Sequence, residues 1–290
     1  MPVILKGANV ANAINKNTQT LVQMLKKTGI EPTLAVIAIM PNNSDLAYQN
    51  TIKKECSVLG ITLKVINMPH NTSTTQLCEQ IEQINKNNSI HGCLLFQPTP
   101  KNIDINKIRT LLKPQKDVDG ITSTSLSAVF TDILDNNLGF APCTAQACIN
   151  ILDYYNIKII GKHIAVIGRS LVVGRPVALL LSNRHATVTI CHSKTQNLAN
   201  ICRNADIIIS AAGVANLVDK TFLSKNQVIL DVGINIVTNG KICGDVDYET
   251  VLNYVEAITP VPGGVGTITT AVLLYNVATA AKNSVKKEVV

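Results

Sequence analysis

Continuous apolar runs alternate with amphipathic stretches along most of the 290-residue chain. Residues 34–39 are all apolar, which is typical of a parallel strand buried on both faces. Residues 44–59 have helical spacing, and Gly60 follows them at the position where glycine commonly ends a helix. The same patterns predict further strands at 61–66 and 92–96 and further helices at 75–85 and 105–112.

A second series of alternating elements begins after Pro142. Its predicted strands are residues 163–167, 187–191, 207–210 and 228–232, and its predicted helices are 145–155, 176–182 and 268–282. Regular alternation of strands and helices is typical of parallel sheets covered by helices. We therefore predict an α/β fold with two α/β units, and we expect the chain to pass between them near residues 138–144 and 260–266.

Composition narrows the classes of function. Apolar residues make up 46% of the chain and charged residues 16%, which is enough for a large core and too little charge for a disordered chain. Aromatic residues are only 3%, with no Trp, and the net charge of +7 is not gathered into basic runs. We therefore expect no nucleic-acid binding, and small anionic molecules are the favoured ligands.

The apolar runs, the first residues and the cysteines bear on where the protein is found and on whether it binds a metal. No apolar run approaches the length of a membrane span, and the first ten residues lack a signal-peptide pattern. We expect a cytoplasmic protein without membrane association. The eight cysteines are dispersed without metal-ligand spacing, so we expect buried, reduced thiols and no metal site.

A glycine-containing turn follows the predicted strand at 163–167. Backbone N–H groups and the helix dipole at such a strand-to-helix turn favour a phosphate, and Gly174 permits close approach of the ligand. The turn does not have the GxGxxG spacing, so a plain strand-to-helix corner is the alternative to a dinucleotide site. The candidate cofactor-binding residues are Gly168, Arg169, Ser170, Gly174 and Arg175.

The end of the next predicted strand separates NADP from NAD. A site for NAD usually has a carboxylate there that binds the ribose 2′-hydroxyl. This chain instead has Ser193, Lys194 and Thr195, and Arg169 lies in the preceding turn. Cations and hydroxyls favour a 2′-phosphate and hence NADP, and the alternative is an ordinary polar loop.

Seven short strings, taken together and in this order, carry a resemblance to a known family. The chain resembles the methylenetetrahydrofolate dehydrogenase/methenyltetrahydrofolate cyclohydrolase family, of the FolD type, from about residue 5 to residue 280. The strings are Lys116-Asp117-Val118-Asp119-Gly120, Pro142-Cys143-Thr144, Val166-Ile167-Gly168-Arg169-Ser170, Val173-Gly174-Arg175-Pro176, Asp231-Val232-Gly233-Ile234-Asn235, Gly244-Asp245-Val246-Asp247 and the string from Ile258 to Gly266.

The resemblance implies a homodimeric enzyme of one-carbon metabolism, with two domains and a cleft between them. A folate-binding catalytic domain would comprise residues 1–140 plus 268–290, and a Rossmann-like NADP-binding domain residues 141–267. The dehydrogenase step would move a hydride from methylenetetrahydrofolate to NADP and leave the methenyl cation. The cyclohydrolase step would add water to that cation and give formyltetrahydrofolate.

The resemblance also implies roles for individual residues. Tyr48 matches the tyrosine that stacks on the folate, and Asp119 matches the acid that binds the pterin amino edge. The alternative for Tyr48 is a role in core packing, and the alternative for Asp119 is a role in a turn. For the loop at Pro262-Gly263-Gly264 the alternative is a plain linker. The matched NADP contacts are Gly168, Arg169, Ser170, Ser193 and Ile234, and the matched folate loop is Pro262, Gly263, Gly264, Val265 and Gly266.

Two positions depart from the family pattern. The family's catalytic lysine, one helical turn after the tyrosine, is Ile52 here, and its glutamine is Phe96. Lys53 and Lys54 are rotated about 100° and 200° away from that position, and Gln97 points to the opposite side of its strand. We expect the dehydrogenase to survive and the cyclohydrolase to be weak. The alternatives are compensation by Lys53 or Gln97, an altered substrate, and a catalytically impaired folate- and NADP-binding paralogue with a regulatory or partner role.

Overall fold

The structure is a computed structural model that describes residues 2–133, 138–237 and 240–285. The chain forms two compact units. The six-stranded unit contains the residues up to Asn12 together with Thr144–Thr269, and the three-stranded unit contains Ala13–Cys143 and the described residues from Thr270 onward. Each unit has its own sheet and its own core.

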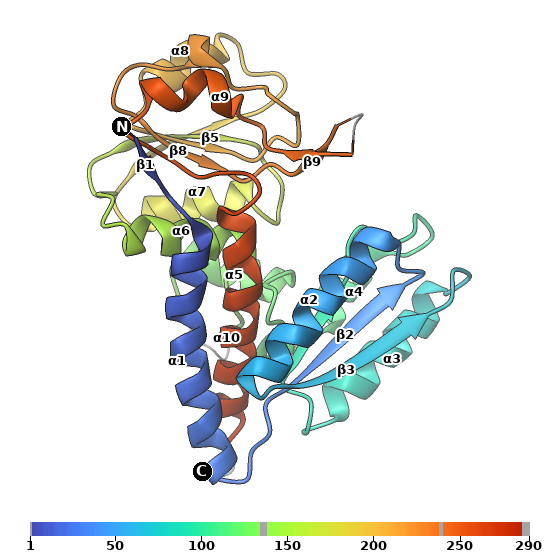
Figure 1. The fold of residues 1–290 in the computed structure, drawn as a ribbon. Helices are drawn as coiled ribbons and strands as arrows, with labels where there is room; N and C mark the ends of the chain where they lie inside the picture. The colour runs from blue at the N-terminus through green and yellow to red at the C-terminus, as the bar shows by residue number, and fades with distance from the viewer. Residues whose placement is uncertain (1, 134–137, 238–239, 286–290) are drawn as a thin grey trace. The chain divides into compact units, whose positions relative to one another are not determined.

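The three-stranded unit is built on a small parallel sheet. Strand β2 (Thr33–Ile39) lies between β3 (Thr62–Met68) and β4 (Gly92–Leu95). Ala35 and Ile37 of β2 pack with helices α3 (Thr74–Lys86) and α4 (Ile105–Leu111), so the alternate residues of β2 face the other side of the sheet. Helix α2 (Asn43–Leu59) follows β2 directly (Figure 1).

The turn after β4 leads to the remaining elements of this unit, η1 (Pro114–Lys116) and α5 (Ser123–Thr131). Between them, the buried Asp117 carboxylate accepts hydrogen bonds from Ile121 N at 2.9 Å, Thr122 N at 2.7 Å and Ser125 Oγ at 2.6 Å. These three bonds fix the backbone on both sides of Asp119. Most of α1 (Gly7–Lys27) and α10 (Val265–Val285) also belongs to this unit.

All strands of the six-stranded sheet are parallel, in the order β1-β11-β8-β7-β5-β6. The chain runs from β5 outward to β6 and then returns to β7 on the other side of β5, which is the strand order of a Rossmann-like sheet. The strands are β1 (Val3–Ile4), β5 (His163–Ile167), β6 (Thr187–Cys191), β7 (Ile207–Ser210), β8 (Val228–Asp231) and β11 (Ala257–Ile258).

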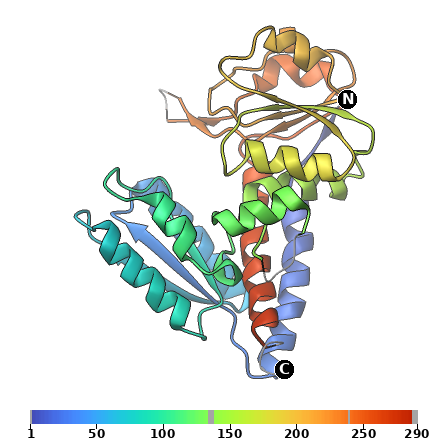
Figure 2. The same cartoon turned by 180° about the vertical axis from the view of Figure 1, so that it is seen from behind.

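Short helices complete this unit, and Figure 2 shows α6 and α7 from behind. A small antiparallel pair, β9 (Asn235–Ile236) and β10 (Ile242–Cys243), extends beyond the parallel sheet. The helices are α6 (Cys143–Tyr154), α7 (Gly174–Asn183), α8 (Leu198–Arg203), η2 (Lys220–Phe222), α9 (Tyr248–Val251) and η3 (Leu252–Tyr254).

The predicted α/β class and the predicted strands and helices are confirmed, with ends that differ by a few residues. All eight cysteines are free thiols and all except Cys243 are buried, as expected. In the part of the chain that the structure describes, no helix is long and apolar enough to cross a bilayer.

The sequence analysis assigned no element before residue 34, and the structure places β1 and α1 there. Consequently the compact units differ from the expected domains at the N-terminus, although 134–137, 286–290 and Met1 lie outside the described residues. Val3 and Ile4 pair in parallel with β11, and Gly7 N donates to Gly263 O at 2.8 Å. A two-residue strand is too short to produce a periodic pattern, so its partner is known only from the fold.

Candidate functional site

The glycine turn after β5 is folded too tightly for side chains at its two ends. Gly168 has a φ of +132°, and a Cβ atom there would lie 2.3 Å from Ala211 O. A Cβ atom at Gly174 would lie 2.2 Å from Gly168 O. Ser170 Oγ accepts a hydrogen bond from Val173 N at 3.1 Å, which closes the turn just before α7. The turn therefore presents backbone N–H groups and the start of a ten-residue helix at the carboxyl edge of the sheet.

The loop after β6 lies beside this turn, because Gly168 N donates to Cys191 O at 2.9 Å. Thr195 Oγ1 accepts from His192 N at 2.8 Å, so its hydroxyl shapes the loop. Ser193 is exposed at this edge. The structure thus brings the two predicted groups of cofactor residues together.

The charges at this edge suit an anion. Arg169, Arg175 and Lys194 are exposed, and none of them has an ion-pair partner among the residues that the structure describes. Ser193 and Lys194 occupy the positions where a site for NAD would have a carboxylate. A turn with glycine at both ends, together with unpaired cations, fits a dinucleotide that carries an extra phosphate.

Asp245 is a residue of this edge to which the sequence analysis gave no role. Its buried carboxylate accepts hydrogen bonds from three successive backbone N–H groups in the loop after β7: Ala212 at 2.6 Å, Gly213 at 3.1 Å and Val214 at 2.9 Å. It also accepts from Asn235 Nδ2 at 3.0 Å. Asp245 therefore ties the loop after β7 to the strand that follows Ile234. The Gly244-Asp245 string was recognised, but its sequence position did not reveal this partner loop.

A second buried acid is interlocked with the first. Asp231 accepts from Gly233 N at 3.1 Å, Asp245 N at 3.0 Å and Val246 N at 3.0 Å. A Cβ atom at Gly244 would lie 1.7 Å from the Asp231 carboxylate. Burial raises the pKa of Asp231 to about 6, and the backbone hydrogen bonds oppose this rise. These contacts fix the backbone on both sides of Ile234.

The predicted folate loop lies in the same unit, after β11. Pro262, Gly263 and Gly266 are exposed, whereas Gly264 and Val265 are buried. Gly266 lies near Ile234, because a Cβ atom at Gly266 would be 3.7 Å from Ile234 Cδ1. The Ile234 side chain is 65% exposed. The structure therefore brings part of the predicted folate loop to a predicted cofactor contact.

Tyr48 and Phe96 form an aromatic pair in the three-stranded unit. Their ring centroids are 5.6 Å apart and their planes are inclined by 30°. Phe96 follows β4 and is held by a hydrogen bond from its N–H to Ile37 O at 3.0 Å. Burial, and to a lesser degree the charge of Asp119, raises the pKa of Tyr48 well above its usual value, while a hydrogen bond with Thr270 opposes the rise. Tyr48 is a neutral phenol at physiological pH.

Asp119 lies close to this pair, since its charge acts on Tyr48. Burial and the neighbouring Asp117 raise the pKa of Asp119 to about 7, and a hydrogen bond with Cys143 opposes the rise. The Cys143 thiol donates to Val118 O at 3.2 Å. The acid therefore exchanges its proton near neutral pH in a largely desolvated position.

Ile52 and Phe96, the two residues that differ from the family pattern, lie where the helix and strand spacing predicts. Ile52 is fully buried on the uninterrupted helix α2, one turn after Tyr48. Lys53, Lys54 and Gln97 are exposed. In this structure no local shift in register replaces Ile52 by a lysine or Phe96 by Gln97 among the described residues.

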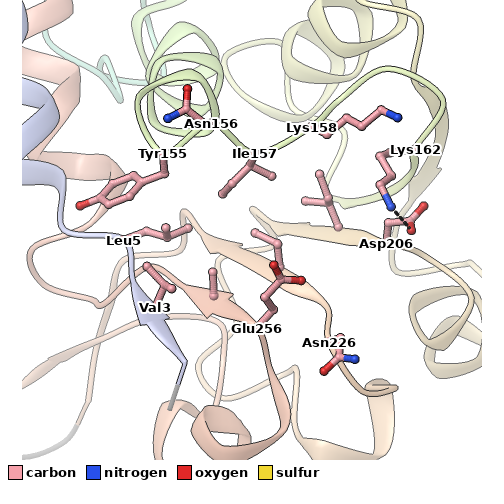
Figure 3. Close-up of a pocket in the computed structure, with 13 residues that line it drawn as sticks. Val3, Leu5, Tyr155, Asn156, Ile157, Lys158, Lys162, Asp206, Asn226 and Glu256 are labelled. Carbon is pink, nitrogen blue, oxygen red and sulfur yellow. Dashed lines mark hydrogen bonds and ion pairs between the residues drawn. The ribbon is translucent and has the colours of Figure 1, made fainter.

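A separate pocket of about 360 Å³ lies at the opposite, amino-terminal edge of the six-stranded sheet (Figure 3). The first residues of β1, β11, β8 and β7 form its floor, and none of the predicted site residues lines it. Lys162 and Asp206, which border it, are already joined by an ion pair of 2.8 Å. The candidate site is therefore at the carboxyl edge and not in this pocket.

A parallel sheet of this order, with a glycine turn after β5, defines the class of nucleotide-binding α/β proteins. Family models match nearly the whole chain: the tetrahydrofolate dehydrogenase/cyclohydrolase catalytic domain matches residues 5–119, and the NAD(P)-binding domain of the same family matches residues 142–285. The chain belongs to the tetrahydrofolate dehydrogenase/cyclohydrolase family.

Curated relatives and solved structures agree with this assignment. The bifunctional protein FolD 1 of Desulfitobacterium hafniense is 41% identical over 283 residues, covering 98% of this chain and all of the relative. The bifunctional protein FolD of Carboxydothermus hydrogenoformans is 43% identical, covering 96% of both chains. The crystal structure of the Campylobacter jejuni bifunctional enzyme FolD has a TM-score of 0.95 at 37% identity, covering 98% of this chain and 99% of that one.

A further relative was solved with a cofactor. The Trypanosoma brucei methylenetetrahydrofolate dehydrogenase-cyclohydrolase, complexed with NADP and an inhibitor, has a TM-score of 0.93 at 31% identity, covering 98% of this chain and 99% of that one. The predicted family and the predicted Rossmann-like sheet are thereby confirmed.

Proposed function

We propose that this protein oxidises methylenetetrahydrofolate to methenyltetrahydrofolate with NADP as the hydride acceptor. The observation that carries the proposal is the carboxyl edge of the six-stranded sheet. There Gly168 and Gly174, at the two ends of the turn, leave no room for a Cβ atom, and Arg169, Arg175 and Lys194 have no ion-pair partner among the described residues. Membership of the family and its NADP-bound relative support the same cofactor.

Different residues at this edge would bind different parts of the cofactor. The backbone of the glycine turn, with Ser170, would bind the pyrophosphate at the start of α7. Arg169, Ser193 and Lys194 would bind the 2′-phosphate, and Thr195 would keep their loop in shape. Ile234 would lie against the nicotinamide end, on a backbone fixed by Asp231 and Asp245. The bound cofactor supplies the acceptor carbon for the hydride.

The folate contacts that we propose follow the family pattern. In the three-stranded unit, Tyr48 would stack on the pterin and Asp119 would bind its amino edge. The loop from Pro262 to Gly266 would line the rest of the ligand. When the hydride leaves the methylene carbon, the two attached nitrogens share the positive charge that remains, so the product is a cation. This step depends on holding the donor and acceptor carbons in line rather than on moving a proton.

The hydrolytic step is proposed to be weak. Water must attack the methenyl carbon and lose a proton while a folate nitrogen leaves. These proton transfers need an acid or a base. Ile52 and Phe96 are hydrocarbon side chains at the two positions where the family pattern has lysine and glutamine. Loss of a general acid or base typically lowers a rate about 10²- to 10⁴-fold.

A two-part assay on the purified protein tests both statements. NADPH formation, followed by absorbance, should depend on methylenetetrahydrofolate, and NAD should be a poorer acceptor than NADP. Loss of methenyltetrahydrofolate in a separate reaction should barely exceed the rate without protein. Absence of folate-dependent NADPH formation would reject the dehydrogenase, and rapid enzymatic loss of the methenyl compound would reject the loss of hydrolysis.

A second candidate function follows from the same two departures. A protein that binds folate and NADP without turnover would act as a regulatory or partner paralogue. Binding of both ligands without NADPH formation would favour it over the enzyme. We also propose a cytoplasmic homodimer, and the exposed Ile236 and Ile242 of the β9–β10 pair support a subunit contact. Light scattering after gel filtration measures the oligomeric state.

A further inference from the structure

The replacement at position 96 does more than remove an amide. Phe96 lies on Tyr48 with 5.6 Å between ring centroids and an inclination of 30°, and its backbone is tied to β2 through Ile37 O. The side chain is 9% exposed, so the ring is held in one place rather than moving freely in solvent. Two adjacent aromatic rings carry partial negative charge on their faces, and this attracts a cation within about 6 Å.

The charge near the pair also differs from the family pattern, and the difference again favours a cationic ligand. The family pattern has a lysine ammonium one helical turn from the tyrosine, and here that position is the buried Ile52. Lys53 and Lys54 are exposed on other sides of α2. The charged group that acts on Tyr48 most strongly is the acid Asp119. A positive ligand beside Tyr48 therefore meets a buried aliphatic side chain at position 52 where the family pattern has an ammonium group.

We infer that the pair Tyr48–Phe96 selects the folate with the cationic methenyl group over reduced folates that lack this charge, so that this protein retains the product of its own oxidation. The inference rests on the proposed dehydrogenase function and adds a ligand preference to it. In the family pattern the same place combines a cation with an amide, which is suited to processing the methenyl group. Here it combines two rings with an aliphatic side chain, which is suited to holding that group.

The preference has a consequence for turnover. A site that binds the product more tightly than the substrate favours product on the protein and slows its release. Retention does not need hydrolysis, and Ile52 and Phe96 offer no acid or base to promote it. The protein would therefore deliver intact methenyltetrahydrofolate, or release it slowly for hydrolysis in solution.

Binding of three folates to the whole protein tests the inference. Methenyltetrahydrofolate carries a positive charge on its one-carbon group, and tetrahydrofolate and 5-formyltetrahydrofolate, which lack that charge, are the comparators. Each is measured immediately after mixing and without NADP. The native protein should bind the cation about 5- to 30-fold more tightly than either comparator. Because the readout is a ratio within one protein sample, partial loss of folded protein does not change it.

Three variants locate the preference. Phe96→Leu removes the ring and should bring the ratio close to one, whereas Phe96→Tyr keeps a ring and should retain it. Phe222→Leu removes a partly buried phenylalanine from the core of the other unit and should leave the ratio as in the native protein. A native ratio near one, or a ratio unchanged by Phe96→Leu, would overturn the inference.

The same samples separate this inference from the proposed function. If NADPH formation occurs and the folates bind equally, the ligand preference is wrong and the dehydrogenase stands. If the ratio is high without NADPH formation, the preference is supported and the dehydrogenase is rejected. If none of the three folates binds, both are rejected.

Discussion

The carboxyl edge of the six-stranded sheet and the Tyr48–Phe96 cluster of the three-stranded unit have diverged to different degrees. At the sheet edge, the family strings are present, and the backbone and glycines do most of the positioning. In the cluster, the tyrosine and the acid match the family pattern, but the positions of the lysine and the glutamine are apolar. Nucleotide binding that relies on main-chain geometry leaves few positions free to change, whereas two side chains can alter proton chemistry without disturbing a fold.

The largest expected effect comes from restoring the family pattern. The double variant Ile52→Lys with Phe96→Gln should raise the cyclohydrolase rate about 10²- to 10⁴-fold, because it returns a proton donor and an amide to the cluster. The measurement is the enzymatic loss of methenyltetrahydrofolate. Thr51→Lys with Phe96→Gln is the matched control, since Thr51 is exposed and would place the same charge on the wrong side of α2. An equal rise in the control would show that position 52 is not decisive.

The next effect concerns the sheet edge. Gly174→Ala should raise the KM for NADP at least about 100-fold and lower the free energy of unfolding by about 3 kcal/mol, because its Cβ would lie 2.2 Å from Gly168 O. Steady-state kinetics and thermal unfolding measure the two quantities. Gly161→Ala is the comparison: Gly161 has a positive φ, of +73°, which Gly174 does not have, and no atom lies within 4 Å of its Cβ position. It therefore measures backbone strain without a clash, and an equal rise in KM in this variant would show that the clash at Gly174 is not what weakens NADP binding.

Asp245→Ala should act on the same edge through the loop after β7. It leaves the N–H groups of Ala212, Gly213 and Val214 without their acceptor, and we expect the KM for NADP to rise about 10-fold or more. Asp206→Ala provides the comparison, because it removes an acid at the amino-terminal edge that accepts from His163 N. An unchanged KM with unchanged stability would reject a positioning role for Asp245.

The smallest expected effect is a pH dependence in the aromatic cluster. In the folded protein the pKa of Asp119 is raised to about 7, well above that of an ordinary aspartic acid, so the native state binds more protons than the unfolded state between about pH 4 and pH 7. The free energy of unfolding contributed by Asp119 therefore falls as the pH rises from about 4 to about 7 and is constant above that. Asp119→Asn should reduce this fall by about 1 kcal/mol or more. Denaturant titrations of both proteins at pH 4.5 and pH 8 measure the free energy of unfolding. An equal change between the two pH values in both proteins would contradict the raised pKa.

Much of the fold was predictable because its information is local. The apolar run at 34–39 and the strand at 163–167 are buried on both faces, so their sequences are distinctive by themselves. The glycine turn at Gly168 was predictable for the same reason, since its strand, turn and helix are consecutive. Helical spacing alone was enough to predict that Ile52 stands at the family's lysine position, because α2 is regular.

The remaining features depend on partners that are distant along the chain. Asp245 accepts from residues 31 to 33 positions away, and β1 pairs with β11 near the other end of the sequence. The stacking of Phe96 on Tyr48 and the raised pKa of Asp119 arise from burial, which packing alone determines. The sequence by itself determined the longer strands and helices after residue 33 and the two apolar replacements, because periodicity and spacing are properties of neighbouring residues. Only the tertiary structure decided which acid holds which loop and which rings meet, because hydrogen bonds and desolvation depend on groups that folding brings together.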